Sequence, residues 1–392
     1  MYSKVHLKKN KDAAVRRNHP WIFSGAIQRK DKDLKDGDIV EVFTYDDQYL
    51  ATGYFQDNTI AIRILSFVKC DIDFSFWLET IGRAFQLRQR LDLTENKATN
   101  AYRLMHAEGD NVSGLIIDIY NNTAVIQCHS IGIHQRIDII AKALKEVLGD
   151  KISVIYDKSK GTLPKNYGQS MENKYLLGEN PANTVLENNQ IFKIDWEKGQ
   201  KTGFFLDQRD NRQLLAELTK DNTVLNTFCY SGGFSIYALA AGASLVHSVD
   251  VSKTAIELTN QNVALNNFEE KHESFAMDVL TFLKQSEMEY DIVVVDPPAY
   301  AKSIKARHNA VQGYKRLNKE AFKKVKSGGL MFTFSCSQVV DRVLFYNTIL
   351  AAALESKRNI KVLHHLSQPA DHPVNIFHPE SSYLKGLVLY VE

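Results

Sequence analysis

The sequence predicts an α/β protein whose carboxyl-terminal half is a parallel sheet with helices on both faces. From residue 224 onward, apolar runs of strand length alternate with segments of helical periodicity. A glycine-rich turn at 230–233 follows the first of these runs, and acidic residues stand where later runs end. Ligands of open α/β sheets bind at the edge formed by the carboxyl ends of the strands, so this edge is the predicted site.

Composition restricts the class of protein. The 392 residues allow two or three domains, and a hydrophobic content of 44% allows each to bury a core. Four cysteines lie far apart without a CxxC pair, and no histidines group at metal spacing, so we expect neither disulfides nor a metal. No secretory signal is recognisable and no apolar run reaches the roughly 18 residues of a membrane span. We therefore expect a cytoplasmic protein without a membrane partner.

Residues 1–73 are predicted to form a small, mainly β domain. Runs at 37–43, 49–55 and 59–67 alternate apolar and polar residues with the period of two that is typical of strands.

A central α+β domain is predicted at 74–185. An apolar stripe of helical spacing at 73–93 opens it, and Asn121 and Asn122 join two strand-like runs. Because Asn tolerates positive φ, these two residues predict a tight hairpin. A helix at 133–148 and a strand at 152–156 complete the domain.

The third domain is predicted at 186–392 and begins with a hairpin at 186–195. Strands are expected near 224–228, 245–249, 273–277, 291–295, 329–334 and 360–366, and helices near 233–241, 252–265, 278–286, 312–326 and 338–355. The last run, 383–391, has no helix before it and is expected to lie antiparallel to its neighbours.

The turn at 230–233 has the features of a nucleoside-binding element. Gly232 and Gly233 lack Cβ atoms and let the backbone approach a ligand, and the next helix begins with unbonded N–H groups. Asp250 ends the following apolar run, where a carboxylate can bind ribose hydroxyls. Because the GxGxxG spacing is absent, the element indicates a nucleoside cofactor without specifying it.

Asp278 and Asp296 also follow predicted strands. Asp278 could accept a hydrogen bond from an adenine amine, although Asp278 and Asp250 could equally cap the helices after them. Asp296 precedes Pro297 and Pro298, which fix φ and donate no hydrogen bond, so they predict a rigid loop. Loops of this type occur in methyltransferases that act on nucleic-acid nitrogens or carbons.

Cys336 stands at the end of the next predicted strand. A lone cysteine is usually a buried, inert thiol, and Cys229 in the turn is interpreted in this way. At the same edge as Asp296, however, a thiolate can be a nucleophile. Cytosine C5 can take a methyl group only after a thiolate has added to C6. After the methyl transfer, a base removes the C5 proton and the thiolate is expelled. This chemistry requires a cysteine beside an acid that pairs with the ring, as Cys336 and Asp296 would be.

The net charge of +2 is unevenly distributed. Residues 1–35 carry ten Lys and Arg against three Asp, and residues 300–326 carry nine against Glu320. Such runs are commonly solvated surfaces, but two of them beside a nucleoside-cofactor motif favour a polyanionic partner. Trp21 adjoins the first run and could stack on a base, or it could belong to the core.

Together these motifs resemble the RlmI-like family of large-subunit ribosomal RNA cytosine-C5 methyltransferases. The matching segments follow the family's order over nearly the whole chain, at 19–26, 202–210, 225–234, 296–298, 313–315, 334–337, 370–374 and 383–386. The sequence departs from the family pattern at Ala299, where Lys follows the two prolines in relatives.

The resemblance implies an N-terminal PUA domain, a small central domain and a Rossmann-like class I domain that binds S-adenosylmethionine. It implies ribosomal RNA as the partner, Cys336 as the nucleophile and Asp296 as the residue that orients the base. The implied cofactor-binding residues are Phe204, Asp207, Gln208, Arg209, Phe228, Tyr230, Ser231, Gly232, Asp250, Val251, Asp278, Val279, Asp296 and Pro297.

Other interpretations remain open. A nitrogen methyltransferase acting on guanine or adenine would need the Pro-Pro loop but not Cys336. A non-catalytic RNA-binding protein of ribosome assembly would keep the fold alone, although the joint presence of the acids and Cys336 argues against it. His372 is either a base or, more in keeping with its loop, a structural residue. Edge strands of the central domain would allow a homodimer.

Overall fold

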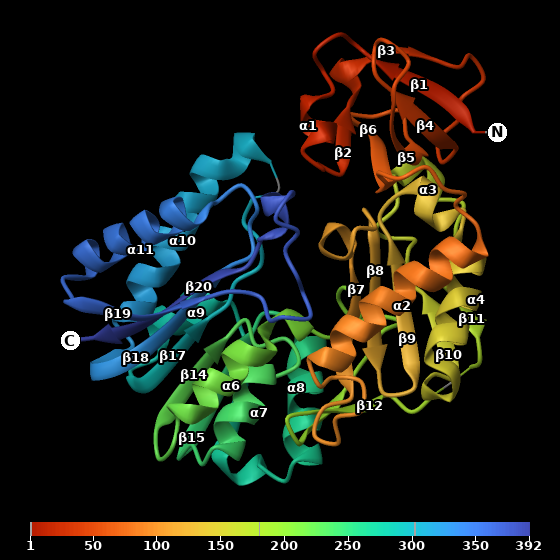
Figure 1. The fold of residues 1–392 in the computed structure, drawn as a ribbon. Helices are drawn as coiled ribbons and strands as arrows, with labels where there is room; N and C mark the ends of the chain where they lie inside the picture. Colours follow the sequence, from red (N-terminus) through yellow and green to blue (C-terminus); the bar gives the residue numbers. More distant parts are fainter. Residues whose placement is uncertain (1, 180, 302) are drawn as a thin grey trace. The chain divides into compact units, whose positions relative to one another are not determined.

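The computed structural model describes residues 2–179, 181–301 and 303–392, which form two compact units (Figure 1). Unit 1 consists of Met1–Val185, Ile194–Leu206 and Ala370–Ser381, and unit 2 consists of Leu186–Lys193, Asp207–Pro369 and Ser382–Glu392. Each unit is therefore assembled from segments that are distant in the sequence. The three-domain boundaries expected from the sequence remain a prediction.

The N-terminal part of unit 1 is a six-stranded sheet in the order β2-β6-β5-β4-β1-β3. Its strands are β1 (Ser3–Leu7), β2 (Trp21–Phe23), β3 (Ile27–Lys30), β4 (Ile39–Phe43), β5 (Tyr49–Phe55) and β6 (Ile60–Ser66), with the short helix α1 (Ala13–Arg16). Alternate residues such as Val40, Val42 and Ile62 are fully buried in its core. The three predicted strands are confirmed, whereas β1, β2 and β3 were not predicted.

The remainder of unit 1 contains a five-stranded sheet in the order β11-β10-β9-β8-β7. The strands are β7 (Ala101–His106), β8 (Leu115–Tyr120), β9 (Thr123–Cys128), β10 (Val154–Asp157) and β11 (Lys174–Leu177), and the helices include α2 (Phe74–Arg90), α3 (Ile131–His134), α4 (Ile137–Leu148) and α5 (Lys165–Gly168). Helices α2 and α4 pack side by side (Figure 1). The predicted hairpin is confirmed, since Asn121 has φ 56° between β8 and β9.

Unit 2 is built on a seven-stranded sheet in the order β16-β15-β14-β17-β18-β20-β19. Its strands are β14 (Thr223–Thr227), β15 (Leu245–Asp250), β16 (His272–Ala276), β17 (Tyr290–Val295), β18 (Val325–Ser335), β19 (Ile360–Leu366) and β20 (Lys385–Val391). Strands β14 to β18 are parallel, and β20 runs antiparallel to both β18 and β19. The antiparallel orientation of the last strand is thus confirmed.

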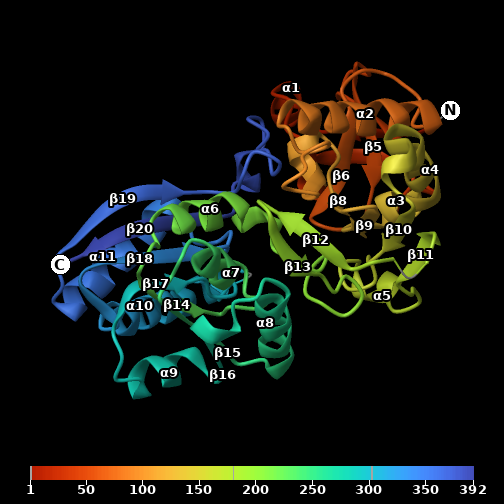
Figure 2. The ribbon, with the colours of Figure 1, turned by 90° about the horizontal axis from the view of Figure 1, so that it is seen from below.

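In the described part of unit 2, the α-helices that accompany this sheet are α6 (Arg209–Glu217), α7 (Gly233–Ala240), α8 (Lys253–Leu265), α9 (Val279–Gln285), α10 (Arg307–Phe322) and α11 (Arg342–Ser356). Residues of α9, α10 and α11 share one apolar core with the sheet. Helices α6 and α7 pack together elsewhere on it, and Figures 1 and 2 show both groupings. The predicted doubly wound arrangement agrees with this pattern.

The predicted helix at 312–326 was wrong at both ends. Helix α10 begins at Arg307, but its buried residues start only at Ala310. The first turn is polar and shows no apolar periodicity, so the start of the helix could not be predicted from the sequence pattern. It ends at Phe322, and β18 begins at Val325, which pairs with Tyr290. The strand therefore begins before the predicted range 329–334 and includes both Gly328 and Gly329.

The predicted hairpin before the sheet is also present, with β12 (Thr184–Glu187) pairing with β13 (Gln190–Lys193). Asn188 and Asn189 have φ 49° and 66°, the combination that a two-residue type I′ turn requires. Among the described residues, no helix has the length and apolar character needed to cross a membrane.

Candidate active site

The residues predicted to carry chemistry gather at the carboxyl-end edge of the parallel strands of unit 2. Asp250 is the last residue of β15, and Asp278 follows β16 by two residues. Asp296 directly follows β17 and Cys336 directly follows β18. Because β17 and β18 are adjacent and parallel, Asp296 and Cys336 emerge from neighbouring strands at the same edge.

The turn after β14 has a backbone conformation suited to close approach of a ligand. Phe228, Tyr230 and Gly232 all have positive φ, at 57°, 48° and 77°. A Cβ atom on Gly232 would lie 2.8 Å from Cγ2 of Thr259. The turn therefore requires glycine at this position, and helix α7 begins immediately after it.

Asp250 is held in place by two backbone donors. The N–H of Tyr230 donates to Oδ2 across 3.1 Å, and the N–H of Ser252 donates to Oδ1 across 2.9 Å. Asp278 is exposed and caps α9, since its Oδ1 accepts from both the N–H and the hydroxyl of Thr281. Capping is thus established for Asp278, and its role toward a ligand stays a prediction.

Asp296 has an altered protonation equilibrium. Burial, reinforced by the nearby carboxylate of Asp207, raises the pKa of Asp296 to about 7. The side-chain amide of Gln208 donates to Oδ2 of Asp296 across 2.9 Å and opposes this rise, and Asn211 in turn donates to the amide oxygen of Gln208 across 2.6 Å. At neutral pH the carboxyl group is therefore present both as the acid, which can donate a hydrogen bond, and as the carboxylate, which can only accept one.

The predicted segment 204–209 is divided between the units. Phe204 is buried in unit 1, whereas Asp207, Gln208 and Arg209 belong to unit 2. Asp207 accepts a hydrogen bond from the hydroxyl of Tyr383 across 2.6 Å. The role of Phe204 toward the cofactor stays a prediction.

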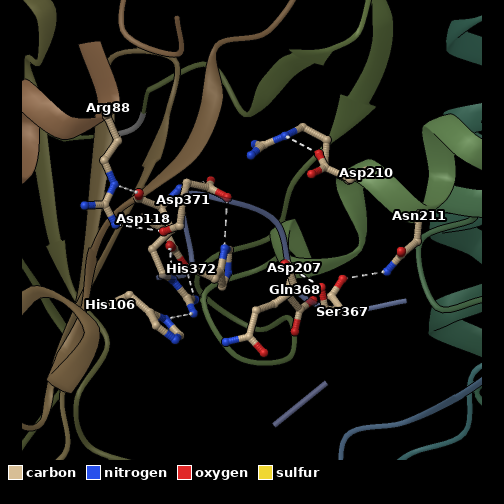
Figure 3. Close-up of polar contacts among 12 residues, drawn as sticks. Arg88, His106, Asp118, Asp207, Asp210, Asn211, Ser367, Gln368, Asp371 and His372 are labelled. Atoms are coloured by element: carbon tan, nitrogen blue, oxygen red, sulfur yellow. Dashed lines mark hydrogen bonds and ion pairs between the residues drawn. The ribbon is translucent and has the colours of Figure 1, made fainter. Parts of the chain in front are cut away.

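Asn211, in the first turn of α6, makes a hydrogen bond in addition to the one that it donates to Gln208. Its amide donates to the carbonyl oxygen of Ser367 across 3.3 Å. Figure 3 marks this bond with a dashed line. Of the remaining predicted cofactor residues, Ser231, Val279 and Pro297 are buried and Val251 is exposed.

Cys336 is half-buried, and the loop behind it is anchored by a lysine that the sequence did not single out. The Nζ of Lys385 donates to the carbonyl of Ser337 across 2.6 Å, and the hydroxyl of Ser337 donates to the carbonyl of Ala301 across 2.7 Å. Lys385 lies opposite Ser335 in the register of β20 and β18. Burial lowers the pKa of Lys385 to about 8, although the nearby Cys336 side chain opposes the shift.

Cys229 differs from Cys336 in its surroundings. It is almost fully buried, and burial raises the pKa of its thiol to about 12. Its sulfur lies 3.6 Å from the hydroxyl of Thr259. The interpretation of Cys229 as a packing residue agrees with these observations.

His372 lies in unit 1, inside a polar network (Figure 3). Its Nδ1 is 3.0 Å from Asp371, and its ring stands 5.0 Å from that of His106. The backbone oxygen of Asp371 accepts from the buried Arg88, whose guanidinium also pairs with both carboxylate oxygens of Asp110. With an exposure of 1%, His372 fits the structural role better than that of a base.

Both basic runs keep exposed cations, such as Arg307 and Arg316 in the second, but four lysines of the second run form ion pairs. In the second, Lys315 and Lys319 both pair with Glu355, and Lys323 and Lys326 also form ion pairs within unit 2. The first run keeps exposed cations such as Lys9, Lys11 and Arg17.

Trp21, beside that first run, is engaged within unit 1. Its indole N–H is 3.0 Å from both Glu108 and Ser113, and its ring packs 4.3 Å from His378.

Comparison with known proteins defines the class. A model of the S-adenosylmethionine-dependent methyltransferase family matches residues 150–384, and a model of the PUA-like domain matches residues 5–67. The fold is thus that of a class I S-adenosylmethionine-dependent methyltransferase with a PUA-like N-terminal domain, as the sequence predicted.

Full-length relatives narrow this class to a family. Ribosomal RNA large subunit methyltransferase I of Alteromonas mediterranea is 38% identical over 398 residues, covering 100% of this chain and 99% of its own. The protein of the same name from Vibrio vulnificus is 38% identical over 400 residues, with both chains covered completely. This chain belongs to the family of the ribosomal RNA large subunit methyltransferase I proteins.

Solved structures support the fold. A protein of Streptococcus mutans assigned to the SAM-dependent methyltransferases superposes with a TM-score of 0.84 at 24% identity, covering 99% of this chain and 100% of its own. A second structure, in complex with SAH, gives a TM-score of 0.85 at 24% identity with the same coverage.

The residues at the sheet edge fit S-adenosylmethionine. The carboxylate of Asp250, oriented by two backbone N–H groups, can accept from ribose hydroxyls, as in other nucleoside sites. Glycine at position 232 lets the turn pack against Thr259, where a Cβ would not fit, and so keeps the turn beside Asp250 in this conformation.

Proposed function

We propose that this protein forms 5-methylcytosine in large-subunit ribosomal RNA through a covalent adduct between Cys336 and C6 of the base. The observation that carries the proposal is that Asp296 and Cys336 follow adjacent parallel strands, at the edge that also holds the cofactor turn. The class of RNA is taken from the names of the full-length relatives.

In the proposed reaction, the thiolate of Cys336 adds to C6 and forms an S–C6 bond. The carboxylic acid form of Asp296 donates a hydrogen bond or a proton to N3, which limits the negative charge that develops on the ring. Its raised pKa keeps this form populated at neutral pH. Bound S-adenosylmethionine supplies the electrophilic methyl group that C5 takes up.

A base then removes the C5 proton. The C–H electron pair restores the C5–C6 double bond, the S–C6 bond breaks, and Cys336 leaves as a thiolate. Because the target base must reach these side chains, it has to leave its stack in the RNA. The PUA-like domain and the exposed cations of the first basic run are proposed to bind the RNA backbone.

The decisive experiment is mass mapping of ribosomal RNA from cells that lack this protein, followed by methylation of that RNA with the purified protein. A single missing 5-methylcytosine that wild type restores is the expected result. The Cys336→Ala variant should not restore it, whereas Cys70→Ala, at a half-buried cysteine of unit 1, should.

Other outcomes identify the alternatives. A mark on a guanine or adenine nitrogen that Cys336→Ala still installs would establish nitrogen methylation and refute the adduct. The absence of S-adenosylmethionine binding in calorimetry would leave only the non-catalytic assembly role. RNA carrying 5-fluorocytosine at the target has no C5 proton to remove. It should therefore trap a complex with wild type that survives denaturing electrophoresis, and none with Cys336→Ala.

A further inference from the structure

Three side chains of metal-ligating type meet in unit 1, away from the methyltransferase sheet. These are His19, His378 and Glu380, and their ligand atoms all lie within 4.8 Å of one another. The Nε2 of His378 is 3.8 Å from the carboxylate of Glu380. Within residues 2–179, 181–301 and 303–392, they form the one cluster of this kind.

His378 supplies a second, independent observation. Its side chain is only 2% exposed, yet neither ring nitrogen has a hydrogen-bond partner among the described residues. Buried polar groups are nearly always bonded, so such an imidazole calls for a ligand. The rings of Trp21 and His19 pack against it at 4.3 Å and 5.4 Å and hold it in position.

His19 is fixed through one ring nitrogen by the backbone of Trp21. Its Nδ1 lies 3.2 Å from both the backbone carbonyl oxygen and the backbone N–H of Trp21, and metal binding through Nε2 selects the tautomer in which Nδ1 donates to the oxygen. A hydrogen bond at one ring nitrogen fixes the ring and leaves the other, here Nε2, available to a metal. Trp21 is itself fixed by its indole bond to Glu108.

We propose that His19, His378 and Glu380 bind one divalent zinc-class cation, with water completing the coordination. Two imidazoles and one carboxylate are ligands that suit Zn²⁺, whereas Mg²⁺ and Ca²⁺ prefer oxygen alone. Bonds of about 2.0–2.1 Å in a tetrahedron place ligand atoms roughly 3.3 Å apart, so the cluster needs only a small contraction. Glu380 is exposed and can move by that amount.

The cation would fasten the segment 370–381 to the start of β2, within unit 1. This role is structural and independent of methyl transfer. It also differs from the sequence-based expectation that no metal is bound, because His19 and His378 stand at opposite ends of the chain and form no motif.

The test is calorimetric titration of the full-length, chelator-treated protein with Zn²⁺ alone. Wild type should bind one equivalent and show a higher Tm with Zn²⁺. Glu380→Gln and His378→Gln should each weaken binding more than the roughly 10- to 100-fold that outer-shell changes cost. His364→Gln, at an exposed histidine of unit 2, should bind as wild type does.

Co²⁺ in place of Zn²⁺ reports on the ligands. Tetrahedral visible bands without thiolate charge-transfer absorption are expected, and thiolate absorption would assign the ion to a cysteine and overturn the proposal. Failure of wild type to bind Zn²⁺ at micromolar concentration would overturn it as well. Because Glu380 is exposed, Glu380→Gln should fold even if His378→Gln does not, and unchanged affinity in Glu380→Gln would also refute the site.

Discussion

Lys385 on the last strand donates a hydrogen bond to the carbonyl of Ser337, one residue beyond Cys336, across 2.6 Å. Both partners are buried, and β20 and β18 are in register around them. The conformation of the loop that carries the proposed nucleophile therefore depends on a strand that enters the sheet from the end of the chain.

Replacing Lys385 by Met should lower the rate of methyl transfer by about 100-fold, since displacement of a reacting group by roughly 1 Å can have this effect. Affinity for S-adenosylmethionine should not change, because the cofactor turn follows a different strand. Single-turnover rates and calorimetry separate the two quantities. Lys361→Met, at an exposed lysine of β19, is the control and should retain full activity. Equal loss of cofactor binding in Lys385→Met would contradict a local role.

Asp296→Asn should remove a pH dependence of stability. The pKa of Asp296 is raised from its usual 3.8 to about 7, so between these values the folded state binds more protons than the unfolded state. Stability contributed by this group therefore falls as pH rises toward 7. Asparagine stays neutral, so the variant should be more stable than wild type at about pH 8 and similar near pH 4. Denaturant titrations at both pH values measure this. A difference that is independent of pH would show that the pKa is not raised.

The same group should control activity. If its acid form assists the addition step, kcat of wild type should fall as pH rises through about 7. Asp296→Asn should be slower by about 100-fold or more and should lack this descending limb. A rate that increases through pH 7 in wild type would mean that Asp296 acts as a base instead.

Gly232→Ala should impair cofactor binding. The added Cβ would meet Cγ2 of Thr259 at 2.8 Å, and the residue has φ 77°. We expect affinity for S-adenosylmethionine to fall at least about 10-fold in calorimetry, with a stability loss of about 1 kcal/mol. Gly242→Ala is a matched control because φ there is 89°, but beyond its chain neighbours no described atom lies within 4 Å of the new Cβ. It should lose similar stability and bind the cofactor normally.

RNA binding should depend on the exposed cations of the first basic run more than on the paired lysines of the second. Replacing the exposed Lys9, Lys11 and Arg17 by Gln should weaken binding and reduce the slope of log K against log salt by about 0.7 for each phosphate that is no longer neutralised. Lys315→Gln and Lys319→Gln remove cations already paired with Glu355 and should change the slope less. A flat salt response in wild type would contradict phosphate binding altogether.

Much of the sheet could be predicted because its strands are short apolar runs that end in recognisable polar residues. Asp250, Asp296 and Cys336 were placed at one edge because parallel strands bring their carboxyl ends together. The hairpin at Asn121 could be predicted for another reason, because asparagine tolerates the positive φ that this turn requires.

What escaped prediction depends on pairing between distant segments. Lys385 has no local signal beyond its place in a family motif, and its partner Ser337 lies just beyond another strand. The cluster of His19 and His378 likewise exists only in the folded chain. The start of α10 was missed because its first turn is polar, so hydrophobic periodicity begins a turn late.

The position of β20 also bears on the order of biosynthesis. A chain emerging from the ribosome can pair β14 to β18 as they appear, but the place between β18 and β19 stays vacant until Lys385–Val391 has been made. Because Lys385 belongs to β20, the loop of Cys336 acquires this anchor only after β20 has been made. A nascent chain that has completed β18 therefore still lacks the hydrogen bond that fixes this loop.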